Sequence, residues 1–209
     1  TVMVPNEILY AMDIIPFQLD NAANTMVTSL RNQEEVFGIA KEFGFVPDLC
    51  SAHRAQTAMG IKGWYPQVDA VVWSHQICDN SAKSGGLVAE RYGVPSFFLD
   101  RPYGASEEDI NYYAAELGEM VSFLEESSGR RMDWDRFLEV LGLAQQMTTL
   151  HREINEIKQA VPSPMANRRG SQLSNIGWLM AGTWEGVNYF TKVRDELKDR
   201  VNRGVGFIQ

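Results

Sequence analysis

The sequence predicts an α/β protein in which a parallel sheet with flanking helices is followed by a helical segment. Two short apolar runs, at residues 68–73 and 96–99, lie on either side of a helical pattern at 81–92. Parallel strands need a crossover between them, so this order favours a strand–helix–strand unit with parallel strands. Further along the chain, apolar residues recur at helical spacing. We place the α/β part at residues 1–130 and the helical segment at 131–209.

The first half of the chain alternates helical and extended patterns. The first clear helical pattern covers residues 32–43 and ends at Gly44, a residue type that suits a helix C-terminus. Residues 45–49 are expected to be short and extended, and a helix is expected at 56–64. The helix at 81–92 also ends at a glycine. Each predicted extended run therefore leads directly into a polar loop.

The second half is predicted to be helical. Ser106 opens a capping-box pattern, which marks the start of a helix that runs to Gly129. Asp133 is expected to cap a second long helix, and Pro162 and Pro164 are expected to end it. The remaining expectations are a polar loop at 167–171, helices at 172–181 and 184–201, and the approach to a further strand at 207–209.

Bulk composition limits the partners and the compartment. The formal net charge is −8, which disfavours the basic surface that nucleic-acid binding requires. The longest apolar runs are far shorter than the roughly 18 residues of a membrane-spanning helix, and no signal-peptide pattern opens the chain. Two cysteines are too few for a disulfide framework in 209 residues. We therefore expect a cytoplasmic protein with no membrane or nucleic-acid partner.

Cys50 and Cys78 have the most informative positions in the sequence. Like Asp100, each follows a predicted strand, and ligands gather at the carboxyl ends of parallel strands. Thiolates are the usual ligands of iron–sulfur clusters, although two of them cannot complete a four-iron cluster. Cysteine is also among the most frequently buried residues, so both side chains could instead fill the core. On position alone, both interpretations stay open.

Several other residues have chemistry that the pattern does not decide. Glu7 is either a buried functional carboxylate or a first-turn acid favoured by a helix dipole. His53 and His75 are candidate ligands or proton donors, and His75 is more simply interpreted as a hydrogen-bonded loop residue. Arg54 can neutralise an anionic cluster, bind a phosphate or pair with a carboxylate. The glycines at 85–86 either approach a phosphate or let a helix pack closely against the sheet.

Four segments, taken in order, match the motifs of one enzyme family. Residues 5–16 resemble its opening pattern P-x-E-L-x-x-A-x-G-x-x-P, and residues 50–54 resemble its first cluster-cysteine segment. Residues 71–79 resemble its second cysteine segment, which contains a Cys-Asp pair, and residues 94–102 resemble its V-P-x-x-x-L-D-x-P strand and loop. The helical stretch at 110–129 fits as well. The family is that of the 2-hydroxyacyl-CoA dehydratase subunits and the related benzoyl-CoA reductases.

The resemblance implies Rossmann-like α/β domains and a 4Fe-4S cluster held by three cysteines, of which Cys50 and Cys78 would be two. It also implies a homologous second subunit and a separate ATP-dependent iron–sulfur activator that injects one low-potential electron. The dehydratases then convert a 2-hydroxyacyl-CoA to a 2-enoyl-CoA through a ketyl radical, an anaerobic radical mechanism. The resulting assignments are Glu7, Ser51 and His53 for catalysis, and Arg54 and Asp100 for binding of the acyl-CoA substrate.

The sequence also departs from the family pattern. Asp13 stands where the family usually has glycine, and Arg101 stands in the loop after the second strand. The third cysteine is expected in a second α/β domain that is missing from this chain. We therefore expect a fragment of a longer subunit, with an incomplete cluster and no turnover by itself. The alternatives are a benzoyl-CoA reductase-type subunit and a non-catalytic, cluster-bearing or structural subunit.

Overall fold

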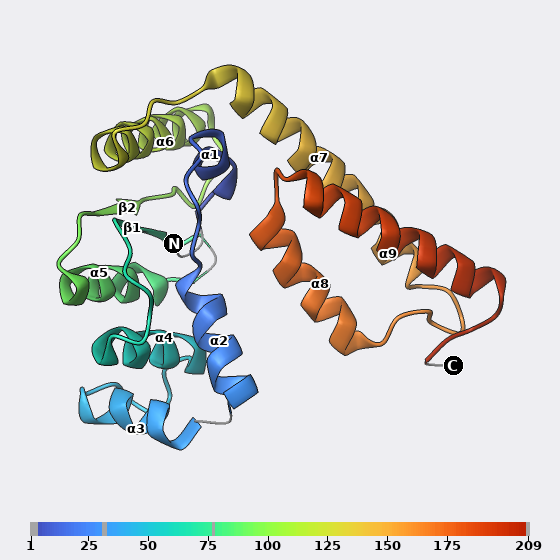
Figure 1. Cartoon of the computed structure of the whole chain (residues 1–209), viewed down its shortest axis with the longest axis horizontal. Coiled ribbons are helices and arrows are strands. Elements are labelled where there is room, and N and C mark those ends of the chain that lie inside the picture. Colours follow the sequence, from blue (N-terminus) through green and yellow to red (C-terminus); the bar gives the residue numbers. More distant parts are fainter. Residues whose placement is uncertain (1–3, 31–32, 77, 208–209) are drawn as a thin grey trace. The chain divides into compact units, whose positions relative to one another are not determined.

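A computed structural model describes residues 4–30, 33–76 and 78–207 of the chain. The chain separates into two compact units: unit 1 contains Val4 and Phe17–Arg131, and unit 2 contains Pro5–Pro16 and residues 132–207 (Figure 1). The described residues are mostly helical and contain one small parallel sheet. The predicted α/β class is thereby confirmed at this level. In the same parts of the chain, no helix has the length and apolar character needed to cross a membrane.

Unit 1 is built around a two-stranded parallel sheet. Strand β1 (Val71–Ser74) pairs with β2 (Ser96–Leu99), and the helix that connects them is α5 (Ser81–Tyr92). Helix α5 contacts both strands, while α6 (Glu107–Ser128) contacts β2, and Figure 1 shows these helices on opposite sides of the sheet. The prediction of a parallel strand–helix–strand unit is confirmed. The capping box that opens α6 at Ser106 is confirmed as well.

The described residues of unit 1 also form α2 (Leu19–Leu30), α3 (Gln33–Glu42) and α4 (Ser51–Lys62). Helix α4 packs against α2, α3 and α5, and apolar residues of these helices share one core with β1. At Gly60, an added Cβ would lie 2.8 Å from Val88 Cγ2, so the missing side chain lets α4 approach α5 closely. The helix predicted at 32–43 corresponds to α3, but Asn32 lies outside the described residues.

The predicted extended run at residues 45–49 is wrong. Residues 47–48 form a turn, which the Leu49 N–H closes by donating to Val46 O at 3.2 Å. Pro47 has no N–H to donate to a sheet, and Val46 is 61% exposed, so the segment has neither ladder hydrogen bonds nor burial to hold a strand. Helix α4 begins at Ser51, earlier than the predicted start at 56. Cys50 therefore precedes a helix and does not follow a strand.

Unit 2 is helical in its described residues, which form α1 (Asn6–Ala11), α7 (Trp134–Ile157), α8 (Asn167–Met180) and α9 (Trp184–Asn202). Helix α7 packs along α9 and also contacts α1. The core between them includes Phe190, which is 1% exposed, together with Leu150 and Leu197. Asp133 caps α7 as predicted, because its side chain accepts a hydrogen bond from the Arg136 N–H at 3.0 Å.

Two predictions for unit 2 are wrong. Residues 167–171 form the first turns of α8 and not a polar loop. Two of its five residues are arginines, which are good helix formers, and most of this segment faces solvent, so its polarity is compatible with a helix. Helix α7 ends at Ile157, before the two prolines that were expected to end it. Of residues 207–209, which are expected to approach a further strand, only Phe207 is described: it lies in a bend, and its N–H donates to Ser163 O at 2.9 Å, while residues 208–209 lie outside the described residues.

Asp13 has a left-handed backbone conformation, with a φ of 55°. This is the position at which the opening pattern of the family has glycine, the residue that adopts this conformation most easily. We predict that Asp13→Val lowers the free energy of unfolding by about 1–2 kcal/mol, because a β-branched side chain is strained there. Asp13→Gly should not be destabilising in the same way. Urea unfolding at neutral pH measures both variants.

Asp13→Asn is the matched control, because asparagine also tolerates the left-handed conformation. It removes the charge that lies 3.6 Å from the Arg136 guanidinium, measured from Asp13 Oδ1 to Arg136 Nη2. An exposed ion pair of this kind contributes little, so the asparagine variant should unfold close to the parent protein. Equal destabilisation by valine and asparagine would show that the ion pair matters and the backbone conformation does not.

Candidate functional site

Cys50 and Cys78 both lie close to the start of a helix of unit 1. Cys50 is the N-cap residue of α4 and is exposed, whereas Cys78 is partly buried and lies three positions before Ser81, the first residue of α5. Both are free thiols. The N–H groups at the start of a helix and the helix dipole favour negative charge nearby. The two helix starts would favour the negative charge of a thiolate-bound cluster at these positions.

Buried hydrogen bonds join the first turns of these two helices. His53 of α4 is 4% exposed, and its Nδ1 lies 3.3 Å from Ser84 Oγ of α5. The Gln56 side-chain amide donates to the same Ser84 oxygen at 3.4 Å. On α5, the Ser81 hydroxyl donates to the Cys78 carbonyl oxygen at 2.6 Å. The polar contacts thus link the segment after Cys50 to the segment after Cys78.

Burial determines the charge of His53. Desolvation lowers the pKa of the His53 imidazole, and the negative charge of Asp20 only partly opposes this effect. A neutral imidazole is compatible with its place among the hydroxyl and amide groups of α4 and α5. The His53 imidazole contacts Ser84. The assignment of His53 to catalysis stays a prediction.

Ser51 and Arg54 lie close to Cys50 in the first turn of α4. Ser51 is exposed at the first position of the helix. The Arg54 guanidinium donates to Pro47 O at 2.9 Å and lies 4.6 Å from the centre of the Phe37 ring. Arg54 therefore ties the turn that precedes Cys50 to α4 and α3. The role of Arg54 in substrate binding stays a prediction.

A second polar cluster lies at the carboxyl ends of β1 and β2. His75 Nε2 is 2.7 Å from Asp100 Oδ1, and the Tyr112 hydroxyl of α6 donates to Asp100 Oδ2 at 2.8 Å. The Arg101 N–H also donates to Asp100 Oδ1, at 2.9 Å. The hydrogen bond from Tyr112 is the main cause that lowers the pKa of Asp100, with His75 and Arg101 adding to it. His75 is thus a hydrogen-bonded loop residue, as its simpler interpretation predicts.

Glu7 belongs to unit 2 and lies in the first turn of α1. Burial raises the pKa of its carboxyl group, and a backbone hydrogen bond only partly opposes that effect. Burial also raises the pKa of Tyr10, and the charges of Glu7 and Glu185 raise it further. Tyr10 donates its hydroxyl hydrogen bond to Leu179 O of α8. The two interpretations of Glu7 are a buried carboxylate and a first-turn acid. The structure shows both a first-turn position and partial burial.

The raised pKa of Glu7 predicts a specific pH dependence of stability. The native carboxyl binds its proton more tightly than the unfolded one, so ionisation costs stability as the pH rises from the ordinary value of 4.5 through the native pKa. Glu7→Gln should therefore raise the free energy of unfolding at pH 7, and the gain should vanish below the ordinary pKa. Urea unfolding across this pH range measures the difference.

Glu156 provides the control for Glu7, because it is an exposed glutamate in α7 of the same unit. Glu156→Gln should not give the gain in stability at pH 7 that is expected of Glu7→Gln, because the Glu156 side chain is exposed to water. A gain for Glu7→Gln that persists in acid would contradict the desolvation argument.

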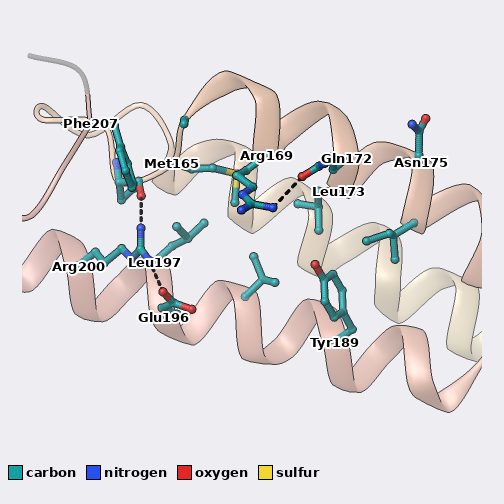
Figure 2. A pocket seen from close by; sticks show the side chains of 14 residues that line it. Met165, Arg169, Gln172, Leu173, Asn175, Tyr189, Glu196, Leu197, Arg200 and Phe207 are labelled. Atoms are coloured by element: carbon teal, nitrogen blue, oxygen red, sulfur yellow. Dashed lines mark hydrogen bonds and ion pairs between the residues drawn. The ribbon is translucent and has the colours of Figure 1, made fainter. Parts of the chain in front are cut away.

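Unit 2 also contains an open cavity of about 740 Å³ between α8 and α9. Figure 2 shows its apolar lining, including Leu173 and Leu197, with Arg169 and Arg200 among the polar side chains. Arg200 Nη1 donates to Pro164 O at 3.3 Å and also pairs with Glu196, so protein groups already engage this cation. None of the predicted site residues lines the cavity. The sequence gives no sign of the cavity, because its lining comes from separate helices, the segment before α8 and Phe207.

The thiols of Cys50 and Cys78 fit part of an iron–sulfur ligand set. They are soft donors on neighbouring helix starts, which is the ligand type that such clusters require. Within the described ranges, no three His, Cys, Asp or Glu side chains gather closely enough to hold a metal ion. The assignment of the pair to two positions of a larger ligand set stays a prediction. A third thiolate from elsewhere in the parent subunit stays a prediction.

Comparisons with known proteins agree with the resemblance. Over residues 1–207 the chain matches the family model described as 2-hydroxyglutaryl-CoA dehydratase, D-component. It is 25% identical to the (R)-phenyllactyl-CoA dehydratase alpha subunit of Clostridium sporogenes, over 96% of this chain and 51% of that protein. It is 22% identical to the (R)-2-hydroxyisocaproyl-CoA dehydratase alpha subunit of Clostridioides difficile, over 98% and 52%. The chain spans about half the length of these two relatives.

Proposed function

Because the chain belongs to the 2-hydroxyglutaryl-CoA dehydratase D-component family, we propose that it is part of the alpha-type subunit of a 2-hydroxyacyl-CoA dehydratase. The enzyme would remove water from a 2-hydroxyacyl-CoA to give a 2-enoyl-CoA. The observation that carries this proposal is the match of nearly the whole chain to alpha subunits of such dehydratases. The parallel β1–α5–β2 unit supports a Rossmann-like domain as part of the same proposal.

In this proposal Cys50 and Cys78 are two of three thiolate ligands of a 4Fe-4S cluster. Their positions before neighbouring helices, and the buried contact between His53 and Ser84, support the assignment. When bound, the cluster would supply a single electron and an iron with an open position that acts as a Lewis acid. Such chemistry suits the removal of a hydroxyl group through a ketyl radical of the thioester.

The chain's own residues have distinct places in the proposal. Ser51 is exposed beside Cys50 and is therefore the predicted catalytic residue best placed to touch a substrate near the cysteines. His53 is buried and holds α4 to α5, so a direct contact with substrate requires movement of that helix pair. Arg54 and Asp100 are the proposed contacts to the acyl-CoA. Glu7 of unit 2 is a proposed proton acceptor, because burial raises the pKa of its carboxyl group and so makes the carboxylate a stronger base.

The partners are part of the same proposal. A homologous second subunit would complete the core enzyme, and an ATP-dependent iron–sulfur activator would deliver the electron. The names of the relatives support a multi-subunit enzyme, since each is called an alpha subunit. We propose anaerobic, cytoplasmic conditions, because a low-potential radical process requires the exclusion of oxygen.

The test of this function uses the complete subunit, produced anaerobically together with its partner subunit. With activator and ATP, it should convert at least one of (R)-phenyllactyl-CoA, (R)-2-hydroxyisocaproyl-CoA and lactoyl-CoA to the corresponding 2-enoyl-CoA, followed by liquid chromatography. Benzoyl-CoA serves as the comparison substrate. Reduction of the aromatic ring without dehydration would assign the protein to the reductase branch. Iron-loaded protein that transforms neither class would indicate a non-catalytic subunit.

A further inference from the structure

The connection between β1 and α5, which carries Cys78, is tied to the loop after β2 by several contacts. Besides the bond between His75 and Asp100, the Arg101 guanidinium donates to Gln76 O at 2.9 Å. The Tyr103 hydroxyl donates to Asp79 Oδ1 at 2.8 Å. These contacts hold residues on both sides of Cys78. All of them originate from a loop that lies more than twenty positions later in the sequence.

Packing and charge keep the two loops together. The His75 side chain is only 11% exposed and stacks on Phe98, with ring centres 5.6 Å apart. The Tyr103 ring packs edge-on against the His75 ring, with ring centres 5.7 Å apart. The hydrogen bond from Tyr112 lowers the pKa of Asp100, which favours its ionised form, and an ionised carboxylate is the stronger acceptor for His75. The partners of Asp100 therefore include α6 as well as the neighbouring loop.

We propose that His75, Asp100 and Arg101 are positioning residues that fix the place of Cys78 relative to Cys50. Strand β1 ends at Ser74, so the strand itself does not fix the residues that follow. On the Cys50 side, α4 begins at the next residue, and a helix is a rigid support. Cys78 lies three positions before α5 and is linked to it by the Ser81 hydroxyl, and the contacts from the β2 loop hold the residues on either side of Cys78. This inference rests on the proposed role of Cys78 as a cluster ligand.

The test uses the fact that the 209-residue chain contains two cysteines, both free. A nitroxide spin label on each gives one label pair, and dipolar broadening of the frozen-solution electron paramagnetic resonance spectrum reports their separation. The parent chain should show one narrow distribution of separations. His75→Ala and Arg101→Ala should both broaden this distribution, because each removes a hydrogen bond that joins the Cys78 segment to the β2 loop. His75→Gln and Arg101→Lys should retain it, because each keeps an N–H donor.

Arg91→Ala is the matched control for Arg101→Ala. Arg91 also donates to a backbone carbonyl in unit 1, from Nε to Ile61 O at 3.1 Å, but it lies at the far end of α5. Its removal should leave the label separation unchanged. Tyr103→Phe removes a single hydroxyl from a side chain that is 80% exposed, so it preserves the fold and should still broaden the distribution. Circular dichroism verifies folding of every variant.

The inference is overturned if the narrow distribution persists in His75→Ala, Arg101→Ala and Tyr103→Phe. The labels require no metal, so this result is independent of the proposed function. In the complete subunit, His75→Ala should lower the iron content and alter the cluster's paramagnetic resonance spectrum, and His75→Gln should restore both. A parent subunit that binds no iron would contradict the proposed function while leaving the label measurement valid.

Discussion

Gly85→Ala is expected to destabilise unit 1 by about 3 kcal/mol, at the upper end of the usual cost of overpacking. A Cβ at Gly85 would lie 2.3 Å from Trp73 Cγ and 2.7 Å from Trp73 Cβ, well inside contact distance. These atoms are close to the backbone of β1, so the clash cannot be relieved by moving the far end of a flexible side chain. Trp73 is also held by the hydrogen bond from its Nε1 to Ala82 O at 2.9 Å. Thermal and urea unfolding measure the loss.

Gly118→Ala is the matched control for this substitution. Gly118 also lies inside a helix of unit 1, but an added Cβ there would have no neighbour within 4 Å. Replacing glycine by alanine in an open helical position stabilises a helix by about 0.5–1 kcal/mol. The two variants should therefore shift stability in opposite directions. A stable Gly85→Ala variant would show that α5 does not pack on β1 as closely as described.

The same packing decides between the two interpretations of the glycines at 85–86. Both face Trp73, at 2.3 Å and 3.2 Å for their closest ideal Cβ contacts. Close helix–sheet packing explains the glycines without any phosphate. The absence of side chains at these positions also lets α5 lie directly against β1. This packing fixes the start of α5. There, the Ser81 hydroxyl donates a hydrogen bond to the Cys78 carbonyl oxygen.

Cys50→Ser and Cys78→Ser are each expected to abolish most of the iron and acid-labile sulfide of the complete subunit. Serine offers a hard oxygen in place of a soft thiolate, and iron–sulfur clusters depend on thiolate ligation. Neither substitution breaks a disulfide, since both cysteines are free. The unfolding of the metal-free chain should therefore change little. Anaerobic iron and sulfide analysis of purified subunits measures the result.

Ser51→Ala separates the role of a ligand from that of a catalytic residue. Ser51 directly follows Cys50 and is exposed, so its replacement leaves the thiol in place. The variant should retain its iron while losing dehydration activity if Ser51 acts on the substrate.

Unchanged iron content in both cysteine variants would remove the ligand assignment and, with it, the main support for a cluster in this subunit.

The elements of unit 1 differ in how far local sequence could predict them. Helix α5 and strand β2 occupy the predicted residues because each combines a clear apolar pattern with a terminating glycine or proline. Helix α2 was missed, although Leu19, Ala23 and Val27 are spaced for one buried face. Its many small and polar residues weaken that signal. Local pattern also failed at residues 45–49, where a short apolar run lacks a partner strand.

The candidate site shows the same division. The family motifs in the sequence identified Cys50, Cys78 and Asp100, since motifs depend on residue type and order. They did not show that His53 is buried between helices or that His75 pairs with Asp100, 25 positions away. Such pairings depend on how α4 packs on α5 and on the register of β1 with β2. Several of the contacts involve polar side chains without periodicity, which leave no signal in a single sequence.

By itself, then, the sequence determined the family, the parallel strand–helix–strand unit and the two cysteines as the residues of interest. Local periodicity, caps and ordered motifs are properties of the chain and can be recognised without its fold. Only the tertiary structure decided that Cys50 begins a helix and that the residues around Cys78 are held by the β2 loop. Those features arise from contacts between distant segments, and burial, which acts on the folded chain alone, lowers the pKa of His53 and raises that of Glu7.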